Sequence, residues 1–498
     1  MNNPPTNIPA DFAGSTAALM GEELYGTYTD ALAQEPPVSI RLNPLKGGDR
    51  FDVPSATAAV PWCREGVYLG NRPTFTADPL MHAGCYYVQE ASSMFVAHVL
   101  RQLVASPVAM LDLCAAPGGK STAARSVLPE GSVLFANEPM RTRANILNEN
   151  ITKYGHPDVV VTNNYPRDYK KARIMFDVIL ADVPCSGEGM FRKDSGAVAD
   201  WSRAKVAECS SLQRDIVSDI WPCLKPGGLL IYSTCTYNTD EDEDNAAWIA
   251  QNLGADFVTV DTQTAWGITP QLKGDNPCYR FIPGRTRGEG LFMTILRKHG
   301  HSDSSVGHPQ KPAKKRSGKS GKDGNKAVGF VGRLPLMHPD RYALVQHGDT
   351  CYAVDRRWET MAQTAAACLN IMGMGIAVCT QRGKSMLPVQ GLALSAELDR
   401  TAYPEAELSQ AEAIAYLRRE AIRLPQDAPT GFVLVTYDGM PLGFVKNIGN
   451  RCNNLYPAEW RIKSSHMDGQ EAGVLRRRTA RERETSARHQ QDNNKTTT

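Results

Sequence analysis

The sequence lacks the features of membrane, secreted and metal-binding proteins. Its 498 residues contain no apolar run near the roughly 20 residues that a membrane-spanning helix needs. The opening MNNPPTNIPADF has neither the basic start nor the apolar core of a secretory signal. The twelve cysteines form no C-x-x-C pair and no cluster with histidines at zinc spacing. We therefore expect a cytoplasmic protein with free cysteines and with no membrane segment, disulfide framework or metal site.

The chain also lacks a strong excess of either charge. Its formal net charge is only +2, so any nucleic-acid surface must be a local patch and not a global basic field. Hydrophobic residues make up 42% and charged residues 22%, which is typical of a soluble globular protein. A chain of this length is too long for one ordinary core, so we expect two to four domains.

Short apolar runs alternate with helical stretches over residues 109–300, and this alternation sets the fold prediction. Continuous apolar strands between helices indicate a parallel sheet covered on both faces, an α/β doubly wound domain. The last two strands are close in sequence and suggest an antiparallel edge. The predicted strands read AMLDLC, SVLFANE, VVVTNN, FDVILAD, GLLIYSTC, FVTV and GLFMTILRK, with helices expected around Arg141–Tyr154 and Ser202–Trp221.

Different textures flank this domain. Residues 1–108 combine helical stretches with the strand-like SIRLNPL and predict a smaller α+β module. Residues 301–326 carry seven lysines and arginines against two aspartates and almost no large apolar residue, which predicts a flexible basic linker. Residues 327–462 predict a second α+β unit, with a hairpin in TGFVLVTYDGMPLGFVKNI. The polar residues 463–498 predict a disordered tail.

The segment LDLCAAPGGKST (111–122) predicts a strand, a tight turn and the start of a helix. Ligands of such sheets bind at the carboxyl ends of the strands. Gly118 and Gly119 allow a ligand to approach the backbone, and the N–H groups of the following helix favour an anionic group. A Walker phosphate loop requires glycine where Cys114 stands, and the dinucleotide pattern G-x-G-x-x-G is absent.

An acidic residue ends the next predicted strand. Glu138 follows Gly119 by 19 residues, a distance at which a carboxylate can reach a ribose diol. A nucleoside that carries a carboxylate in place of a pyrophosphate would satisfy both features. The alternative, an ordinary strand–helix turn with a solvent-facing glutamate, remains open at this point.

Two cysteines lie at the ends of neighbouring predicted strands, at the same edge as the glycine loop. Cys185 follows Asp182 closely, and Cys235 ends the next strand. Neighbouring strands are about 5 Å apart, so the two thiols could share one pocket. The alternative for any single cysteine is that of a small buried hydrophobic residue.

Two thiols beside a methyl donor suit the methylation of cytosine at carbon 5. A thiolate that adds to carbon 6 makes carbon 5 nucleophilic, and covalent catalysis of this kind divides one hard step into easier ones. A free thiol has a pKa of about 8.5, so the attacking group needs help, which a sulfonium cation could partly supply. Asp182 is positioned to hydrogen-bond the base or the cofactor. The second thiol has a plausible role in product release, and position alone leaves either thiol as the attacker.

These motifs resemble the Sun-type RNA cytosine-5 methyltransferases, particularly the bacterial branch that acts on 16S ribosomal RNA of the small subunit. The resemblance implies a Rossmann-like class I methyltransferase sheet, preceded by an N-terminal α+β module and followed by a PUA-like α+β RNA-binding domain. The stretches that carry it lie in order between Arg41 and Lys298: RLNPL, YYVQEASSM, DLCAAPGGKST, ANE, DVPCSGEGMFRKD, LKPGGLLIYSTCTYN and RGEGLF. A weaker likeness to the PUA-like domain lies in KSMLPVQG, GFVLVTYDGMPLGFVKN and NNLYPAEWR.

The resemblance also implies roles for particular residues. Cys235 would be the nucleophile, Cys185 would assist product release, and Asp182 would close the site. The family usually has an aspartate near the adenine after the third strand, where this chain has Tyr165, so Asn163 or Asn164 is an alternative contact. S-adenosylmethionine would be held by Cys114, Ala115, Ala116, Pro117, Gly118, Gly119, Lys120, Glu138, Asn164, Tyr165 and Asp182.

The implied partner is ribosomal RNA, free or in the small ribosomal subunit, and we expect a monomer. The target cytosine should be unpaired or flipped, because a base inside a duplex is out of reach. Alternatives are the same chemistry on transfer RNA or 23S ribosomal RNA, a small-molecule or protein methyltransferase, or a largely non-catalytic ribosome-assembly factor. Candidate RNA contacts are Arg192, Lys193, Arg285, Arg287, Lys446 and Arg451, although exposed charges are often only solvated.

Overall fold

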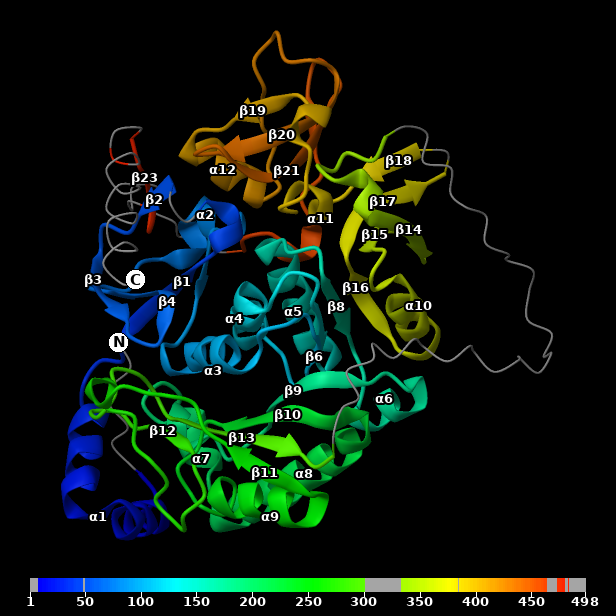
Figure 1. Ribbon diagram of the computed structural model, residues 1–498. Helices are drawn as coiled ribbons and strands as arrows, with labels where there is room; N and C mark the ends of the chain where they lie inside the picture. The colour runs from blue at the N-terminus through cyan, green and yellow to red at the C-terminus, as the bar shows by residue number, and fades with distance from the viewer. Residues whose placement is uncertain are drawn as a thin grey trace, which may run out of the picture.

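The computed structural model describes residues 8–47, 50–300, 333–383, 385–463, 473–479 and 482. At its centre lies a twisted sheet of strand order β11-β13-β10-β9-β6-β7-β8-β16, with β12 paired to β13 (Figure 1). Strands β10, β9, β6, β7 and β8 are parallel, whereas β13 runs antiparallel to β10 and to β11. The strands are β6 (Ala109–Asp112), β7 (Val133–Asn137), β8 (Val159–Thr162), β9 (Phe176–Asp182), β10 (Leu224–Thr234), β11 (Ala255–Val258), β12 (Tyr279–Phe281), β13 (Leu291–Lys298) and β16 (Ile371–Met374).

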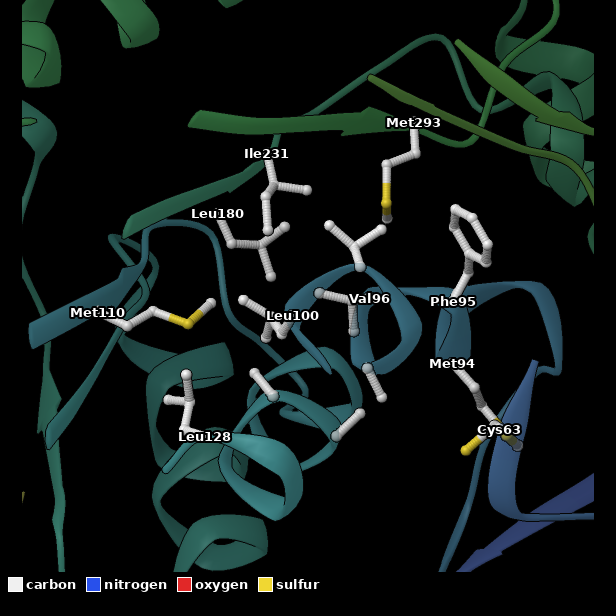
Figure 2. Packing of buried hydrophobic residues seen from close by; sticks show 14 of the residues in the cluster. Cys63, Met94, Phe95, Val96, Leu100, Met110, Leu128, Leu180, Ile231 and Met293 are labelled. Atoms are coloured by element: carbon white, nitrogen blue, oxygen red, sulfur yellow. The ribbon is translucent and has the colours of Figure 1, made fainter. Parts of the chain in front are cut away.

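Both faces of this central sheet are covered by helices. Successive strand residues point to opposite faces, so Met110 packs into one core and Leu111 into the other. Figure 2 shows the first core, where Leu180 and Ile231 of the sheet meet Leu100 of α3. One face carries α3 (Phe95–Leu103), α4 (Gly119–Val127) and α5 (Arg141–Tyr154), and the other carries α6 (Pro166–Ala172), α8 (Arg203–Ile220) and α9 (Glu243–Leu253).

The predicted α/β class and its antiparallel edge are confirmed. The parallel strands are mainly apolar because both faces are buried, as the sequence pattern indicated. The helix predicted over Arg141–Tyr154 has these bounds in the structure, and β11 pairs antiparallel with β13. The hairpin predicted in the C-terminal region is formed by β20 and β21, with both turn residues, Asp438 and Gly439, at positive φ.

The N-terminal region forms a small sheet of order β3-β4-β1-β5 beside α3. Helix α1 is interrupted at Gly21, which has a φ of 75°. Its Phe12 and Tyr28 pack against Phe191 and Tyr237, residues of loops that follow β9 and β10. The elements are α1 (Ala10–Leu32), β1 (Val38–Leu42), β2 (Phe51–Asp52), β3 (Ala56–Val60), β4 (Cys63–Leu69), α2 (Pro79–His82) and β5 (Tyr86–Val88), and α7 (Ser195–Asp200) lies near α1.

The C-terminal half contains two small sheets, of which the second, the C-terminal sheet, shares a core with the N-terminal region. Ile40 and Leu80 of that region pack with Tyr416 and Val433. The first sheet comprises β14 (Tyr342–His347), β15 (Thr350–Asp355), β17 (Ile376–Arg382) and β18 (Ser385–Pro388), accompanied by α10 (Glu359–Cys368) and α11 (Gln390–Ala393). The C-terminal sheet comprises β19 (Glu405–Glu407), β20 (Gly431–Tyr437), β21 (Met440–Asn447) and β22 (Cys452–Asn454), with α12 (Gln410–Leu417).

Residues 333–398, which we call the middle module, are built onto the central sheet. Strand β16 extends that sheet beyond β8 (Figure 1), an arrangement that the sequence did not predict. Arg341 donates to Asp158 at the foot of β8 over 2.7 Å and to Asp355 over 2.5 Å. The indole of Trp358 donates to the carbonyl of Gly131 over 2.9 Å. The module is therefore docked by a sheet ladder, a partly buried ion pair and a hydrogen bond.

Part of the predicted disordered tail is ordered, which corrects that expectation. Strand β23 (Arg476–Arg477) pairs with β2 of the N-terminal region. Asp52 binds Arg476 over 2.6 Å, and the carboxylate of Asp78 accepts the backbone N–H of Val474 over 3.0 Å. Acidic partners far away in the sequence thus order a segment that is too polar to fold by itself. The predicted linker, residues 301–326, lies outside the described residues.

The described ranges contain neither a candidate membrane-spanning helix nor a candidate metal-binding cluster. Among them, no helix has both the length and the apolar character for a membrane crossing. Across the same ranges, no group of three or more histidine, cysteine, aspartate or glutamate side chains is arranged to hold a metal ion.

Candidate functional site

The predicted site residues gather at the carboxyl edge of the central sheet. The glycine loop follows β6, Glu138 follows β7, and Asn163–Tyr165 follow β8. Cys185 and Cys235 lie in the loops that follow β9 and β10. Parallel strands direct their carboxyl ends to one edge, which explains why segments far apart in sequence meet there.

The glycine loop is held by hydrogen bonds from both sides. The backbone N–H of Ala115 donates to the carbonyl of Asn137 over 2.8 Å. The carbonyl of Pro117 accepts from Asn150 over 2.8 Å and from the hydroxyl of Tyr87 over 3.2 Å. Gly118 has a φ of 113°, a left-handed conformation that glycine adopts without strain. Helix α4 then begins at Gly119 and presents its N-terminus to the edge of the sheet.

A buried arginine from the RLNPL motif supports this helix. The guanidinium of Arg41 is 1% exposed and donates to Thr122 over 2.5 Å and to Gln89 over 2.8 Å. The hydroxyl of Thr122 in turn donates to the carbonyl of Gly118 over 2.8 Å. The N-terminal region thus fixes the glycine loop from behind.

Two buried carboxylates at this edge retain an acceptor oxygen without a hydrogen-bond donor from any described residue. One is Oδ1 of Asp112, and the other is Oε2 of Glu138. The other oxygen of each carboxylate accepts a hydrogen bond. Ser121 donates to Oδ2 of Asp112 over 2.6 Å, and the N–H of Met140 donates to Oε1 of Glu138 over 3.0 Å. The nearest cation to Glu138 is Arg143, at 3.6 Å. Buried acceptors of this kind fit a ligand with hydroxyl or ammonium donors.

The residues after β8 make hydrogen bonds to neighbouring loops. Oδ1 of Asn164 accepts the backbone N–H of Asn370 over 3.0 Å. The side chain of Asn163 donates to the carbonyls of Glu138 and Pro139, both over 2.8 Å. Tyr165 is 55% exposed, and its ring lies 5.3 Å from the guanidinium carbon of Arg167. The two asparagines therefore hold the loop, and Tyr165 is open to solvent at the edge.

The two thiols lie together. Sγ of Cys185 and Sγ of Cys235 are 3.1 Å apart, and the backbone N–H of Cys235 donates to Sγ of Cys185 over 3.4 Å. The hydrogen bond to Cys235 raises the pKa of the Cys185 thiol well above its usual value, and burial raises it further. Cys185 is accordingly a neutral thiol that can donate its proton toward Cys235.

Asp182 links the cysteine loops to the glycine loop. Lys120 donates to its Oδ2 over 2.9 Å, and Ser233 of β10 donates to its Oδ1 over 2.7 Å. Burial opposes the charge on Lys120, but attraction to Asp182, with a smaller contribution from Cys235, raises its pKa overall. The ammonium of Lys120 is therefore held by Asp182, and it interacts electrostatically with Cys235.

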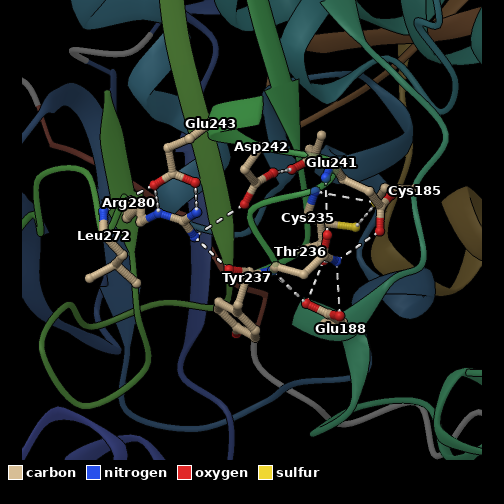
Figure 3. Close-up of polar contacts among 12 residues, drawn as sticks. Cys185, Glu188, Cys235, Thr236, Tyr237, Glu241, Asp242, Glu243, Leu272 and Arg280 are labelled. Carbon is tan, nitrogen blue, oxygen red and sulfur yellow. Dashed lines mark hydrogen bonds and ion pairs between the residues drawn. The ribbon is translucent and has the colours of Figure 1, made fainter. Parts of the chain in front are cut away.

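A buried glutamate joins the two cysteine loops (Figure 3). Glu188, three residues after Cys185, is 2% exposed. Its Oε2 accepts from the hydroxyl of Thr236 over 2.5 Å and from the N–H groups of Tyr237 and Asn238 over 2.7 and 3.0 Å. Its Oε1 accepts from the indole of Trp201 over 2.9 Å. The loop after β10 is thus fixed by the loop after β9.

Glu241 makes the reciprocal connection from the second loop to the first. Its Oε2 accepts the backbone N–H of Ser186 over 3.0 Å and the side-chain amide of Gln213 over 2.7 Å. Its Oε1 accepts from Asn238 over 2.9 Å. Burial raises the pKa of Glu241, while the hydrogen bonds from Ser186 and Asn238 lower it. We call Glu188 and Glu241 together the carboxylate clasp.

A buried ion cluster lies behind the clasp. Arg280, 1% exposed, pairs with Asp242 at 3.1 Å and forms a two-point ion pair with Glu243. It also donates to the carbonyl of Tyr237 over 3.0 Å, while Thr234 donates to Asp242 over 2.5 Å. The segment on the carboxyl side of Cys235 is therefore anchored at both ends.

The candidate RNA contacts separate into buried and exposed residues. Arg192 is 8% exposed, pairs with Glu289 at 2.8 Å and donates to the carbonyl of Ala31 over 2.9 Å, which removes it from the candidates. Lys193 also pairs with Glu289, at 3.5 Å. The exposed candidates are Arg285, Arg287 against the ring of Tyr68, Lys446 against the ring of Phe432, and Arg451.

The sequence did not single out Asp112, Glu188, Glu241 or Asn370. A signal was present for Asp112, since a carboxylate interrupts an apolar strand directly before the glycine loop. Glu188 and Glu241 follow the two cysteines closely in sequence. This position alone does not distinguish a buried glutamate from an exposed one. Asn370 carried no signal, because its partners are two hundred residues away along the chain.

The clasp yields the first prediction. In Glu188→Gln, an amide NH2 group replaces one carboxylate oxygen and cannot accept a hydrogen bond. At least two of the buried donors that now bind Glu188 therefore lose their acceptor. We expect the free energy of unfolding to fall by about 3 kcal/mol in urea titrations, since each buried unpaired donor costs about 1–3 kcal/mol. Glu208→Gln, whose side chain is 71% exposed, is the matched control and should stay within about 0.5 kcal/mol. Equal losses in the two variants would contradict the clasp.

The buried carboxyl group of Asp112 makes the stability of the fold depend on pH. Burial raises the pKa of Asp112 from 3.8 to about 7. Between about pH 4 and 7 the carboxyl group of Asp112 ionises in the unfolded chain but stays protonated in the folded protein. The free energy of unfolding therefore falls as the pH rises through this interval. Between pH 5 and 8 the wild type should lose about 3 kcal/mol relative to Asp112→Asn, measured in urea at several pH values. Parallel pH curves for the two proteins would refute the raised pKa.

Sequence comparison agrees with this architecture along the chain. Residues 8–91 match the model of the N-terminal domain of 16S rRNA methyltransferase RsmF. Residues 104–297 match the 16S rRNA methyltransferase RsmB/F family. Residues 403–462 match the methyltransferase RsmF PUA domain. None of these three matches covers residues 298–402, which include the middle module.

Curated relatives match over most of both chains. A ribosomal RNA small subunit methyltransferase F from Enterobacter sp. (strain 638) is 31% identical over 418 residues, 80% of this chain and 83% of the relative. The protein of the same name from Pectobacterium atrosepticum is 30% identical over 490 residues, 91% and 96% of the two chains. The crystal structure of PH0851 shares the fold, with 22% identity and a TM-score of 0.50 over 60% of this chain and 70% of that one. The chain therefore belongs to the RsmB/F family of 16S rRNA methyltransferases.

Proposed function

We propose that this enzyme methylates carbon 5 of one cytosine in 16S ribosomal RNA, with S-adenosylmethionine as donor and a covalent bond between Cys235 and the base. The observation that carries the proposal is the pair of thiols 3.1 Å apart, beside a glycine loop and two buried carboxylates with unused acceptors. The relatives named as small-subunit RNA methyltransferases support the substrate. The protein acts in the cytoplasm, as a monomer, on free RNA or on the small subunit.

S-adenosylmethionine matches the chemistry of the edge. Glu138 would accept from the ribose hydroxyls, and Asp112 from the ammonium of the methionine part, because each has an oxygen without a donor from the described residues. The turn Cys114–Gly119 would cradle the methionine part, and its carboxylate would meet the N-terminus of α4. Tyr165, open at the edge, would contact the adenine. When bound, the cofactor supplies an electrophilic methyl group.

Cys235 opens the reaction. Its thiolate adds to carbon 6 of the cytosine, which forms the sulfur–carbon bond and moves electron density to carbon 5. Lys120, held by Asp182, places a positive charge near this thiol, as a thiolate nucleophile requires. Asp182 retains acceptor capacity on both oxygens and can bind the exocyclic amine of the base. The carboxylate clasp keeps the loop of Cys235 still during attack.

Cys185 acts at the end of the reaction. After methyl transfer, the proton on carbon 5 passes to solvent water, its electron pair re-forms the double bond between carbons 5 and 6, and the bond from carbon 6 to Sγ of Cys235 breaks. Cys185 is a neutral thiol because its pKa is raised by the hydrogen bond to Cys235 and by burial. Its proton can therefore stabilise the departing Sγ of Cys235, 3.1 Å away. Both groups are cysteine thiols, so the side chains themselves do not distinguish the nucleophile from the group that assists release. The proposed assignment uses the different surroundings of the two thiols.

RNA would be held by the exposed cations on both sides of the site. Arg285 and Arg287 belong to the loop before β13, Lys446 belongs to β21 and Arg451 to the turn that follows it, in the region that matches a PUA domain. Contacts to phosphates would fix the register of the RNA, and the cytosine would enter the site unpaired.

Methyl transfer gives the decisive experiment. The protein is incubated with S-adenosylmethionine labelled in the methyl group and with 16S RNA, naked or in small subunits. We expect label in 5-methylcytosine, at one position. Label in transfer RNA or 23S RNA instead would mean that the enzyme carries out the same reaction on a different RNA. Absence of 5-methylcytosine from every ribosomal and transfer RNA would reject the proposal.

The roles of the thiols give the next prediction. Cys185→Ala lacks the group that assists release, so it should accumulate a covalent protein–RNA adduct that survives denaturing electrophoresis. Cys235→Ala should form no adduct and no product. Cys368→Ala, which changes an exposed cysteine in the middle module, is the matched control and should turn over normally. An adduct with Cys235→Ala and none with Cys185→Ala would mean that the roles are reversed.

A further inference from the structure

The middle module, which none of the three family matches covers, reaches the edge where the cofactor loops end. Its strand β16 runs antiparallel to β8, with Ile371 opposite Thr162. Thr162 is the last residue of β8, so Asn370 stands just beyond the carboxyl end of that strand. Figure 1 shows β16 alongside β8 at the margin of the central sheet.

Asn370 makes three hydrogen bonds to the loop after β8. Its carbonyl accepts the backbone N–H of Asn163 over 2.9 Å. Its own backbone N–H donates to Oδ1 of Asn164 over 3.0 Å, and its side-chain amide donates to Oδ1 of Asn163 over 3.2 Å. The first polar groups beyond the end of β8 are thus held by the middle module and not by the loop itself.

These contacts continue to the other cofactor loops. The amide of Asn163 donates to the carbonyls of Glu138 and Pro139, both over 2.8 Å. The backbone of Asn164 exchanges two hydrogen bonds with the side chain of Asn137, whose amide also donates to the carbonyl of Leu113 over 3.0 Å. Asn370 is therefore the outer end of a chain of asparagines that connects the loops after β8, β7 and β6.

We propose that Asn370 is a positioning residue of the cofactor site, and that the middle module is a working part of the catalytic unit. The inference rests on the proposed function. Asn370 contacts Asn163, and Asn163 holds the backbone of Glu138, whose Oε2 has no hydrogen-bond donor among the described residues and is the acceptor offered to the ligand. Without the side chain of Asn370, Oδ1 of Asn163 loses a hydrogen bond, so the Asn163 amide is held less tightly and the Glu138 carboxylate is less well ordered before binding.

The docking of the module does not depend on Asn370. Arg341 binds Asp158 over 2.7 Å, and Trp358 binds the carbonyl of Gly131, at the opposite end of the strands from Asn370. Helix α10 packs its Ala362 and Ala365 into the core shared with β7 and β8. A change of one exposed side chain at position 370 therefore leaves the module in place, and its effect can be read at the site.

The test compares Asn370→Ala, Asn163→Ala and the double variant in the full-length protein. In Asn370→Ala the dissociation constant for S-adenosylmethionine, measured by calorimetry, should rise about fivefold, the effect of one hydrogen bond of about 1 kcal/mol. Amide hydrogen exchange of residues 159–166 should be faster in the protein without ligand. The KM for RNA and kcat at saturating cofactor should stay unchanged. The double variant should bind the cofactor no more weakly than Asn163→Ala, because both changes break one chain of contacts.

Gln363→Ala is the matched control, because Gln363 is exposed in the same module and donates to Glu359 of its own helix. It should match the wild type in every measurement. The inference is overturned if Asn370→Ala binds the cofactor and exchanges like the wild type, if the two single effects add, or if only the KM for RNA changes. A wild type that binds S-adenosylmethionine but makes no 5-methylcytosine would reject the proposed function and leave these measurements valid.

Discussion

The geometry of the site depends on one interaction, the hydrogen bonding of the buried Glu188 carboxylate to the loop after Cys235. The ladder between β9 and β10 ends at Asp182 and Ser233, and beyond it the backbone N–H of Gly189 still donates to the carbonyl of Cys235 over 2.8 Å. Glu188 and Glu241 reinforce this connection between the two cysteine loops from opposite directions. A carboxylate is tolerated at this depth because each oxygen meets several donors, and a network satisfied in this way is rigid. A separation of 3.1 Å between the thiols follows from that rigidity.

The sequence predicted the local elements well and the long-range ones poorly. Helix α5, strand β9 and the Asp438–Gly439 turn follow from patterns within a few residues, and each has the predicted extent. The carboxyl-edge position of the glycine loop and the cysteines follows from the rule for parallel sheets. Strands β16 and β23 escaped prediction because each is too short to form alone and is stabilised by a partner strand hundreds of residues away.

The same limit applied to individual site residues. Residue type and spacing pointed to Cys185, Cys235, Asp182 and Glu138, because their chemistry is rare at strand ends. Arg192 was misread as a surface charge, since nothing near it in sequence reveals its pairing with Glu289. A charged side chain shows its role only through its partner, and a partner about a hundred residues away is invisible in a local pattern.

The catalytic unit is consequently larger than the segment that carries the motifs. The N-terminal region supports the glycine loop through Arg41, and helix α1 packs on the residues that follow both cysteines. The middle module contributes a strand to the central sheet and Asn370 to its edge. A nucleophile and a methyl donor must meet within a few tenths of an ångström, and loops alone do not hold such a tolerance. Each cofactor or cysteine loop is accordingly supported by an element from elsewhere in the chain, so changes distant from the thiols should act through the position of the groups that bind cofactor and base and not through contact.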